Sequence, residues 1–344
     1  MPSTAEPGRE ARSLAVASPS KLPRWRGFNL VEKFSVDRPE RNTSFREADF
    51  ELIARWGFDF ARLPMDYRTW TDDGNLRGLR EPVLEEIDQA VEWGGQYGIH
   101  VSINFHRAPG YCVNAPPEPT DLWTDEATQE ACALQWGVFA ERYRGMPNDR
   151  LSFNLLNEPK EVDEATYVPV VERLVEAIRE KDPGRLVIAD GLDLGWTPVP
   201  GLAGLSIGQS LHAYDPWGVS HYRAPWFPGA EEWDEPTWPL PTGVGVRDKN
   251  VLRNERVGPW KALERRGVGI HVGEFGTFNG TPHSVTLAWM EDFLDLFREA
   301  GWGWCLWNLR GAYGPLDSER ADVEYERFEG HLLDRQMLEL IQRS

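Results

Sequence analysis

The chain has 344 residues, 41% of them hydrophobic and 27% charged, which fits one large globular domain or two ordinary ones. Its 55 acidic residues outnumber the 37 basic residues, and the net charge of -18 repels phosphate backbones and anionic membrane surfaces. Nucleic acid and membranes are therefore excluded as expected partners, and no run of about 18 apolar residues predicts a transmembrane helix. A neutral ligand such as a sugar carries no such electrostatic penalty.

The N-terminal segment predicts a disordered leader over residues 1–22, followed by one folded domain over residues 23–344. The segment lacks the apolar stretch of roughly 7–15 residues that a secretory signal peptide requires. We therefore expect a cytoplasmic protein, unless a signal was removed from the chain. We also expect a monomer or a small homo-oligomer.

Eight short apolar runs rich in β-forming residues recur along the chain. They are residues 25–31, 58–65, 99–106, 150–159, 185–191, 206–214, 269–276 and 302–310. Helical periodicity separates most of them, at 44–56, 81–97, 125–144, 163–181, 250–266 and 283–300, and a last helix is expected at 331–342. Ser44 and Glu47 have the spacing of a capping box, which predicts a helix start at Ser44. The fifth crossover, 192–205, is short and rich in Gly and Pro.

Eight such units of about 40 residues each predict a single-domain (β/α)₈ TIM barrel of the α/β class. The alternative is a doubly wound open sheet. That fold normally carries a Gly-rich phosphate loop after an early strand, and GFNLVEKF supplies none.

Cysteines and tryptophans add less specific information. Cys112, Cys132 and Cys305 are an odd number without a C-x-x-C spacing, so they predict no metal site. Cys305 lies in an apolar run and is expected to be a buried thiol, whereas a bridge between Cys112 and Cys132 stays open. The 16 tryptophans exceed what a core needs, so several are expected on a binding surface.

Polar and aromatic side chains recur where the predicted strands end. In a (β/α)₈ barrel, the carboxyl ends of the strands and the following loops form the active site. The residues at these ends are Arg62, His106, Asn157, Glu158, His212, Tyr214, Glu274 and Trp307. We therefore expect them to surround one mouth of the barrel.

Two of these residues, Glu158 and Glu274, suffice for cleavage of a glycosidic bond. One carboxyl group must be protonated to donate to the leaving oxygen, and the other must be ionised to attack or to activate water. Arg62 is a candidate permanent charge beside the ionised partner. His100 and His106 lack a third ligand at a suitable position, so we predict neither a metal nor another cofactor.

In motif order, the chain resembles glycoside hydrolase family 5, the cellulase-like retaining glycosidases. The motifs are ARLPMDYRTW, NFHRAPGY, LLNEP, LHAY, GEFG and WNLRGAYGPLD, within residues 25–341. The resemblance implies that Glu158 is the general acid/base and Glu274 the nucleophile. It also implies that Asn157 holds the 2-hydroxyl of the sugar, while Tyr214 and Arg62 set the geometry and ionisation of Glu274.

By the same resemblance, His106 and His212 line the subsite of the cleaved sugar, and Trp307 stacks beneath that sugar. The substrate is expected to be a β-glucan-type oligosaccharide or a short β-glycoside. Arg107 is a departure, because exo-glucanase relatives tend to carry Gly there, so their substrate preference cannot be transferred.

The long loop at 215–249 contains Trp217, Trp226, Trp233 and Trp238, and we expect it to fold over the mouth. A mouth blocked on one side favours exo action, and the missing signal sequence favours small substrates. Three alternatives stay open: a secreted-type endo-β-1,4-glucanase or mannanase, a transglycosylase, and a non-catalytic carbohydrate-binding barrel.

Overall fold

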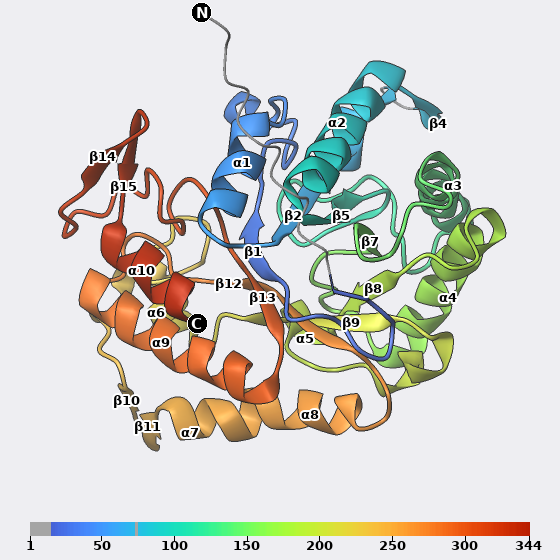
Figure 1. The fold of residues 1–344 in the computed structure, drawn as a ribbon. Coiled ribbons are helices and arrows are strands. Elements are labelled where there is room, and N and C mark those ends of the chain that lie inside the picture. The colour runs from blue at the N-terminus through green and yellow to red at the C-terminus, as the bar shows by residue number, and fades with distance from the viewer. Residues whose placement is uncertain (1–14, 73–74) are drawn as a thin grey trace, which may run out of the picture.

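The computed structural model describes residues 15–72 and 75–344. Eight parallel strands form a closed barrel surrounded by helices (Figure 1). The barrel strands are β1 (Arg26–Asn29), β2 (Phe60–Asp66), β5 (His100–Ala108), β7 (Leu151–Asn154), β8 (Val187–Asp190), β9 (Gly208–Ala213), β12 (Ile270–Phe275) and β13 (Gly303–Leu306). Neighbours in sequence are neighbours in the sheet, and pairs of β2 with β5 and of β1 with β13 complete the ring. The predicted TIM barrel is confirmed.

The helices follow the predicted crossovers, with one exception. The main ones are α1 (Glu47–Arg55), α2 (Glu81–Tyr97), α3 (Glu126–Arg142), α4 (Glu164–Lys181), α8 (Gly258–Glu264), α9 (His283–Ala300) and α10 (Arg335–Arg343). The segment before α8 consists of α7 (Lys249–Leu252) and a π-helical turn, η5 (Arg253–Val257). After β8 there is only the short α5 (Leu192–Gly195) and the 3₁₀ segment η3 (Pro200–Leu205), as the Gly and Pro content of this crossover indicated.

The start of α1 differs from the prediction. The helix begins at Glu47 with Arg46 as its N-cap, and no side chain caps it, so the expected capping box at Ser44 is wrong. Elsewhere Asp side chains accept hydrogen bonds from the first turn, as Asp125 does for α3, Asp163 for α4 and Asp334 for α10.

The smaller elements lie in the loops. They are η1 (Pro39–Arg41), η2 (Tyr67–Thr69), β3 (Thr71–Asp72), β4 (Asn75–Leu79), β6 (Tyr111–Cys112), α6 (Trp217–Ser220), η4 (Ala230–Glu232), β10 (Leu240–Thr242), β11 (Gly245–Arg247), β14 (Glu326–Phe328) and β15 (His331–Leu333). Among the described residues, each helix is too short or too polar to cross a lipid bilayer.

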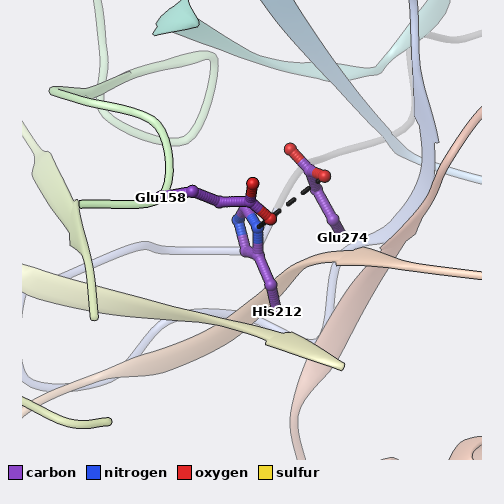
Figure 2. A group of neighbouring side chains, drawn as sticks. All are labelled: Glu158, His212 and Glu274. Atoms are coloured by element: carbon purple, nitrogen blue, oxygen red, sulfur yellow. Dashed lines mark hydrogen bonds and ion pairs between the residues drawn. The ribbon is translucent and has the colours of Figure 1, made fainter. Parts of the chain in front are cut away.

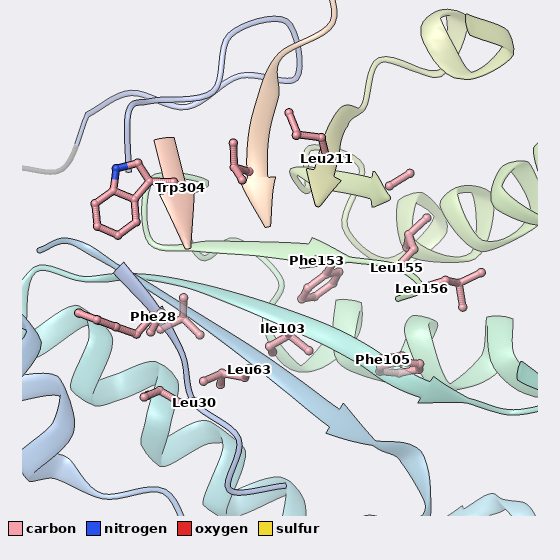
Figure 3. Packing of buried hydrophobic residues seen from close by; sticks show 14 of the residues in the cluster. Phe28, Leu30, Leu63, Ile103, Phe105, Phe153, Leu155, Leu156, Leu211 and Trp304 are labelled. Carbon is pink, nitrogen blue, oxygen red and sulfur yellow. The ribbon is translucent and has the colours of Figure 1, made fainter. Parts of the chain in front are cut away.

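Side chains of the barrel strands alternate between an apolar outer face and a more polar interior. On β2, Ala61 and Leu63 join the main core, in which strands pack against helices (Figure 3). Between them, Arg62 hydrogen-bonds in the barrel interior to Asn29 on the adjacent β1 and to Asn154 on β7. The alternation therefore delivers polar groups to the barrel axis, where the site forms.

The amino ends of the strands are closed by a second apolar cluster, the floor of the barrel. It consists of Leu22, Trp25, Phe60, Leu186, Ile188 and Cys305. The Gly269 amide also donates to the carbonyl of Pro19 at 2.7 Å. Leu22 of the predicted leader is therefore packed into the floor, and residues 17–19 are partly buried, whereas Val16 is 90% exposed and residues 1–14 lie outside the described part of the chain.

The long loop after β9 divides into two parts. Near the mouth, Trp217 stacks on Trp196 with ring centroids 4.8 Å apart, and Trp226 is 49% exposed beside Phe278. Farther along, Trp238 donates from Nε1 to Asp292 on α9 at 2.9 Å, outside the barrel. Only the first part of the loop therefore borders the mouth.

Cys112, Cys132 and Cys305 are free thiols, so the open Cys112–Cys132 bridge is not formed.

Candidate active site

Glu158, His212 and Glu274 meet at the carboxyl ends of three strands (Figure 2). A carboxylate oxygen of Glu158 and one of Glu274 lie within 4.8 Å of each other. The His212 ring lies close to both, with Nδ1 2.8 Å from Oε1 of Glu158 and 3.7 Å from Oε2 of Glu274. The two glutamates predicted from strand ends far apart in sequence thus face one another.

Glu274 is 3% exposed, and two donors reach its carboxylate. Arg62 donates from Nη1 to Oε1 at 2.6 Å, and the hydroxyl of Tyr214 donates to Oε2 at 3.0 Å. Burial raises the pKa of Glu274 to about 7, although the positive charges of His212 and Arg62 act to lower it. The two hydrogen bonds to its oxygens favour the ionised form, which these donors stabilise against burial.

Arg62 is held rigidly in the barrel interior. Its Nε donates to Asn154 Oδ1 at 2.8 Å, and its Nη2 donates to Asn157 Oδ1 at 2.8 Å. Nη1 also donates to Asn29 Oδ1 at 3.0 Å, in addition to its bond with Glu274. A guanidinium with its donors engaged in this way is fixed in position, and it fixes Glu274 in turn.

Glu158 lies just beyond β7 in a left-handed backbone conformation, with φ of 50°. A non-glycine residue in this region costs about 1–3 kcal/mol, so the surroundings must impose it. The Tyr111 hydroxyl donates to the Glu158 carbonyl at 2.6 Å, and the Glu158 amide donates to Asp190 Oδ2 at 3.1 Å. The Lys160 amide donates back to the Tyr111 hydroxyl at 2.8 Å. These bonds direct the Glu158 side chain towards His212.

His106 and Trp307 lie together beside the carboxylate pair, with ring centroids 5.6 Å apart. Phe34, on the loop after β1, contacts both rings, at 4.4 Å from His106 and 5.6 Å from Trp307. Burial, with the nearby charge of Arg62, lowers the pKa of His106 well below its usual value, so the ring is neutral. These three rings form an aromatic surface next to the two glutamates.

Three buried polar atoms of His106, Asn157 and His212 form no hydrogen bond among the described residues. Nε2 of His212 still has an ion-pair partner in Asp190 at 3.2 Å, whereas Nδ1 of His106 and Nδ2 of Asn157 have none. Buried polar groups are nearly always paired in folded proteins, so unpaired ones at a site are suited to a polar ligand such as a sugar hydroxyl.

The structure brings all eight sequence-predicted residues to one mouth of the barrel.

The comparison with known proteins agrees with this arrangement. The chain matches the model of the cellulase family (glycosyl hydrolase family 5) over residues 18–312. The chain belongs to glycoside hydrolase family 5. Endoglucanase C of Acetivibrio thermocellus is 27% identical to it over 312 residues, covering 83% of this chain and 90% of that protein. Cellodextrinase A of Ruminococcus flavefaciens is 27% identical over 297 residues, covering 80% of this chain and 82% of the relative.

A solved structure of a glycoside hydrolase is 35% identical to this family 5 chain, with a TM-score of 0.88. The match covers 93% of this chain and 99% of the other. The family predicted from the ordered motifs is confirmed, and the protein is a glycoside hydrolase. Its substrate is an oligosaccharide or a polysaccharide.

Sequence reasoning missed several residues of this family 5 site. Asp190 ends β8 in RLVIADG, a strand-end position like those of the predicted site residues, but it is not among them. Tyr111 begins the short strand β6, and Asn114 and Phe34 lie in loops. The side-chain Nδ2 of Asn114 is 3.0 Å from Nε2 of His106, and no local sequence pattern predicts such a contact.

Arg107 holds these loops in place through buried hydrogen bonds. It is 4% exposed and donates to the carbonyls of Asn114 and Pro116, each at 2.9 Å, and to the carboxylate of Glu118. Its Nε is 3.8 Å from Asp66, whose Oδ2 accepts from the Val36 amide at 3.3 Å. Arg107, at the position where exo-glucanase relatives tend to carry Gly, is therefore a buried tie between the loops after β1, β2 and β5.

Proposed function

We propose that this family 5 enzyme is a retaining β-glycosidase, with Glu274 as nucleophile and Glu158 as general acid/base. The observation that carries the proposal is the carboxylate pair, whose oxygens approach within 4.8 Å. Retaining enzymes hold their carboxyl groups about 5–5.5 Å apart, whereas inverting enzymes need about 6.5–9.5 Å to admit a water between them. The hydrogen bonds from Arg62 and Tyr214 support Glu274 as the ionised partner.

The reaction has two steps. In the first, a Glu274 oxygen attacks the anomeric carbon, the glycosidic bond breaks, and Glu158 gives its proton to the leaving oxygen. In the second, Glu158 takes a proton from water, and that water displaces Glu274 from the anomeric carbon. Asn157 Nδ2 is the donor for the 2-hydroxyl, and Trp307 is the platform beneath the sugar.

We propose β-glucan-type oligosaccharides or short β-glycosides as substrates, with cleavage at chain ends. The aromatic groups of the first part of the long loop, Trp217 and Trp226, support a wall on one side of the mouth. The relative named cellodextrinase A is compatible with short substrates. Internal cleavage of polymers is the second candidate, because another relative is named endoglucanase C.

Three measurements test this function. Proton NMR of the sugar released from an aryl β-glucoside should first show the β-anomer, and early α-anomer would overturn the retaining mechanism. In a soluble β-glucan solution, viscosity should fall slowly relative to the reducing ends formed. A rapid viscosity loss at low bond cleavage would establish internal cutting, and oligosaccharide products with an added acceptor would reveal transglycosylation.

A further inference from the structure

Asp190 contacts four groups of the catalytic centre from the end of β8. Its side chain is completely buried. Oδ1 accepts from Asn154 Nδ2 at 2.8 Å, and Oδ2 accepts from the Glu158 amide at 3.1 Å. Oδ2 is also 3.2 Å from Nε2 of His212 and 3.7 Å from Nη2 of Arg62. This carboxylate is thus in contact with the residues that hold both glutamates.

The ring of His212 lies between acids on both sides. Its Nε2 faces Asp190, and its Nδ1 faces Glu158. An ionised carboxylate only accepts hydrogen bonds, so a ring with carboxylate oxygens at both nitrogens satisfies them best when each nitrogen carries a proton. The geometry therefore favours the imidazolium form of His212.

The other charged groups around His212 are consistent with this form. Glu274 contributes a third acid at 3.7 Å, and the neighbouring cation, Arg62, is itself paired with Glu274 and Asp190. Burial lowers the pKa of His212, but Glu274 and Asp190 outweigh it and raise the pKa to about 10. The nearby rings of His106 and His271 are neutral, because burial lowers the pKa of each.

We propose that Asp190 is a positioning residue that keeps His212 as a cation between the two catalytic glutamates. This cation then sets the pH range in which Glu158 and Glu274 share the single proton that the first step requires. The proposal rests on the proposed roles of the two glutamates. It adds a third acid to the site, one that touches no substrate and acts through His212.

The chemical consequence concerns the activity profile. A cation within 4 Å of two carboxylates favours their ionised forms, so both limbs of the pH profile lie lower than they would beside a neutral ring. Asn at position 190 keeps the size of the side chain but removes the charge that holds the second proton on His212. In Asp190→Asn, both limbs of the kcat/KM profile should therefore move to higher pH by about one unit.

A direct measurement on the unmodified enzyme keeps the proposal testable if the variant does not fold. In ¹⁵N-histidine NMR spectra at pH 8, both nitrogens of His212 should be protonated, with the signal assigned by its loss in His212→Gln. A neutral His212 ring at pH 8 would overturn the proposal. In Asp190→Asn, the His212 ring should lose its second proton below pH 8.

Asp182→Asn is the matched control, since Asp182 is a buried acid that pairs with Arg185 at 2.7 Å, remote from the mouth. It should lower stability and leave the pH profile in place. A profile of Asp190→Asn that coincides with wild type contradicts the inference and leaves the proposed function standing. Absence of hydrolysis by the wild-type enzyme on all β-glycosides would instead contradict the proposed function, whatever the charge of His212.

Discussion

The two ends of the barrel interior both contain buried histidines, in opposite states. At the floor, His100 and His271 have their pKa lowered to about 3 by burial. At the mouth, the equally buried His212 has its pKa raised to about 10 against the same effect. Burial is common to all three rings, so it does not decide their charge.

The difference lies in their partners. The ring nitrogens of His100 face the Asp149 carbonyl at 2.9 Å and the Ser152 hydroxyl at 2.8 Å, and its ring stacks on Trp25. None of these partners is charged, so a proton on His100 would be uncompensated. His212 faces three carboxylates. The floor therefore supplies packing with neutral polar groups, and the mouth concentrates charge where chemistry needs it.

The largest expected contrast between the two ends is in turnover. Glu274→Gln at the mouth should lower kcat/KM on every β-glycoside by roughly 10,000-fold or more, because an amide cannot form the glycosyl-enzyme. His100→Gln at the floor should retain activity within about twofold of wild type. Initial rates on an aryl β-glucoside check both. A Glu274→Gln rate within tenfold of wild type would assign the nucleophile to another residue.

A second variant at the mouth separates the two glutamates. Glu158→Gln should lose about 100- to 10,000-fold on glycosides with poor leaving groups, because proton donation to the leaving oxygen is lost. The loss should be much smaller on an activated dinitrophenyl glycoside, whose leaving group needs no proton. Steady-state kinetics on both substrates gives the comparison, and equal losses would remove support for Glu158 as the acid.

The contrast in charge should also appear as opposite pH dependence of stability. The folded pKa of His212 lies above its unfolded value, so its stabilising contribution is complete below pH 6.5 and is lost as pH rises towards 10. The free energy of unfolding of wild type relative to His212→Gln should fall by on the order of 3 kcal/mol between pH 7 and 9.5. Urea unfolding at both pH values measures this difference, which stays constant if the ring is neutral.

His100 should behave in the reverse sense and with a smaller effect. Its folded pKa lies below the unfolded value. As pH falls from 6.5 towards 3, His100 binds a proton in the unfolded chain but not in the folded protein, so wild type loses stability. His100→Gln lacks this penalty. Its disadvantage relative to wild type at pH 7 should shrink by about 2 kcal/mol at pH 4.5. A constant difference in urea unfolding would show that His100 is protonated in the fold.

The sequence predicted what depends on short-range pattern. Apolar runs predict the strands. Because parallel barrel strands end at one mouth, the sequence alone also predicts that residues such as Arg62 and Glu274 lie close together. Contacts between loops have no such periodicity. Tyr111 bonds to Glu158, and Phe34 reaches His106, through chain paths that only packing determines. Asp190 obeys the same strand-end rule, but an acid next to Gly is also the pattern of an ordinary turn.

Short-range signals also failed where tertiary contacts outweighed them. The Ser44 capping box does not start α1, and Leu22, within the predicted disordered leader, packs into the floor. For Leu22, the polar composition of its neighbours conceals a position that packing against the barrel determines.

The buried tie at Arg107 has a consequence for how this enzyme can change. Asp66 ends β2, Arg107 lies in β5 and Glu118 lies in the loop after β5, and Asp66 also accepts from the Val36 amide in the loop after β1. Exchange of the loop after β5 with that of a relative would remove the Glu118 carboxylate and the two carbonyls that Arg107 binds, and would leave this buried cation with Asp66 at 3.8 Å. A transplant of that loop into this barrel would therefore need a matching residue at position 107.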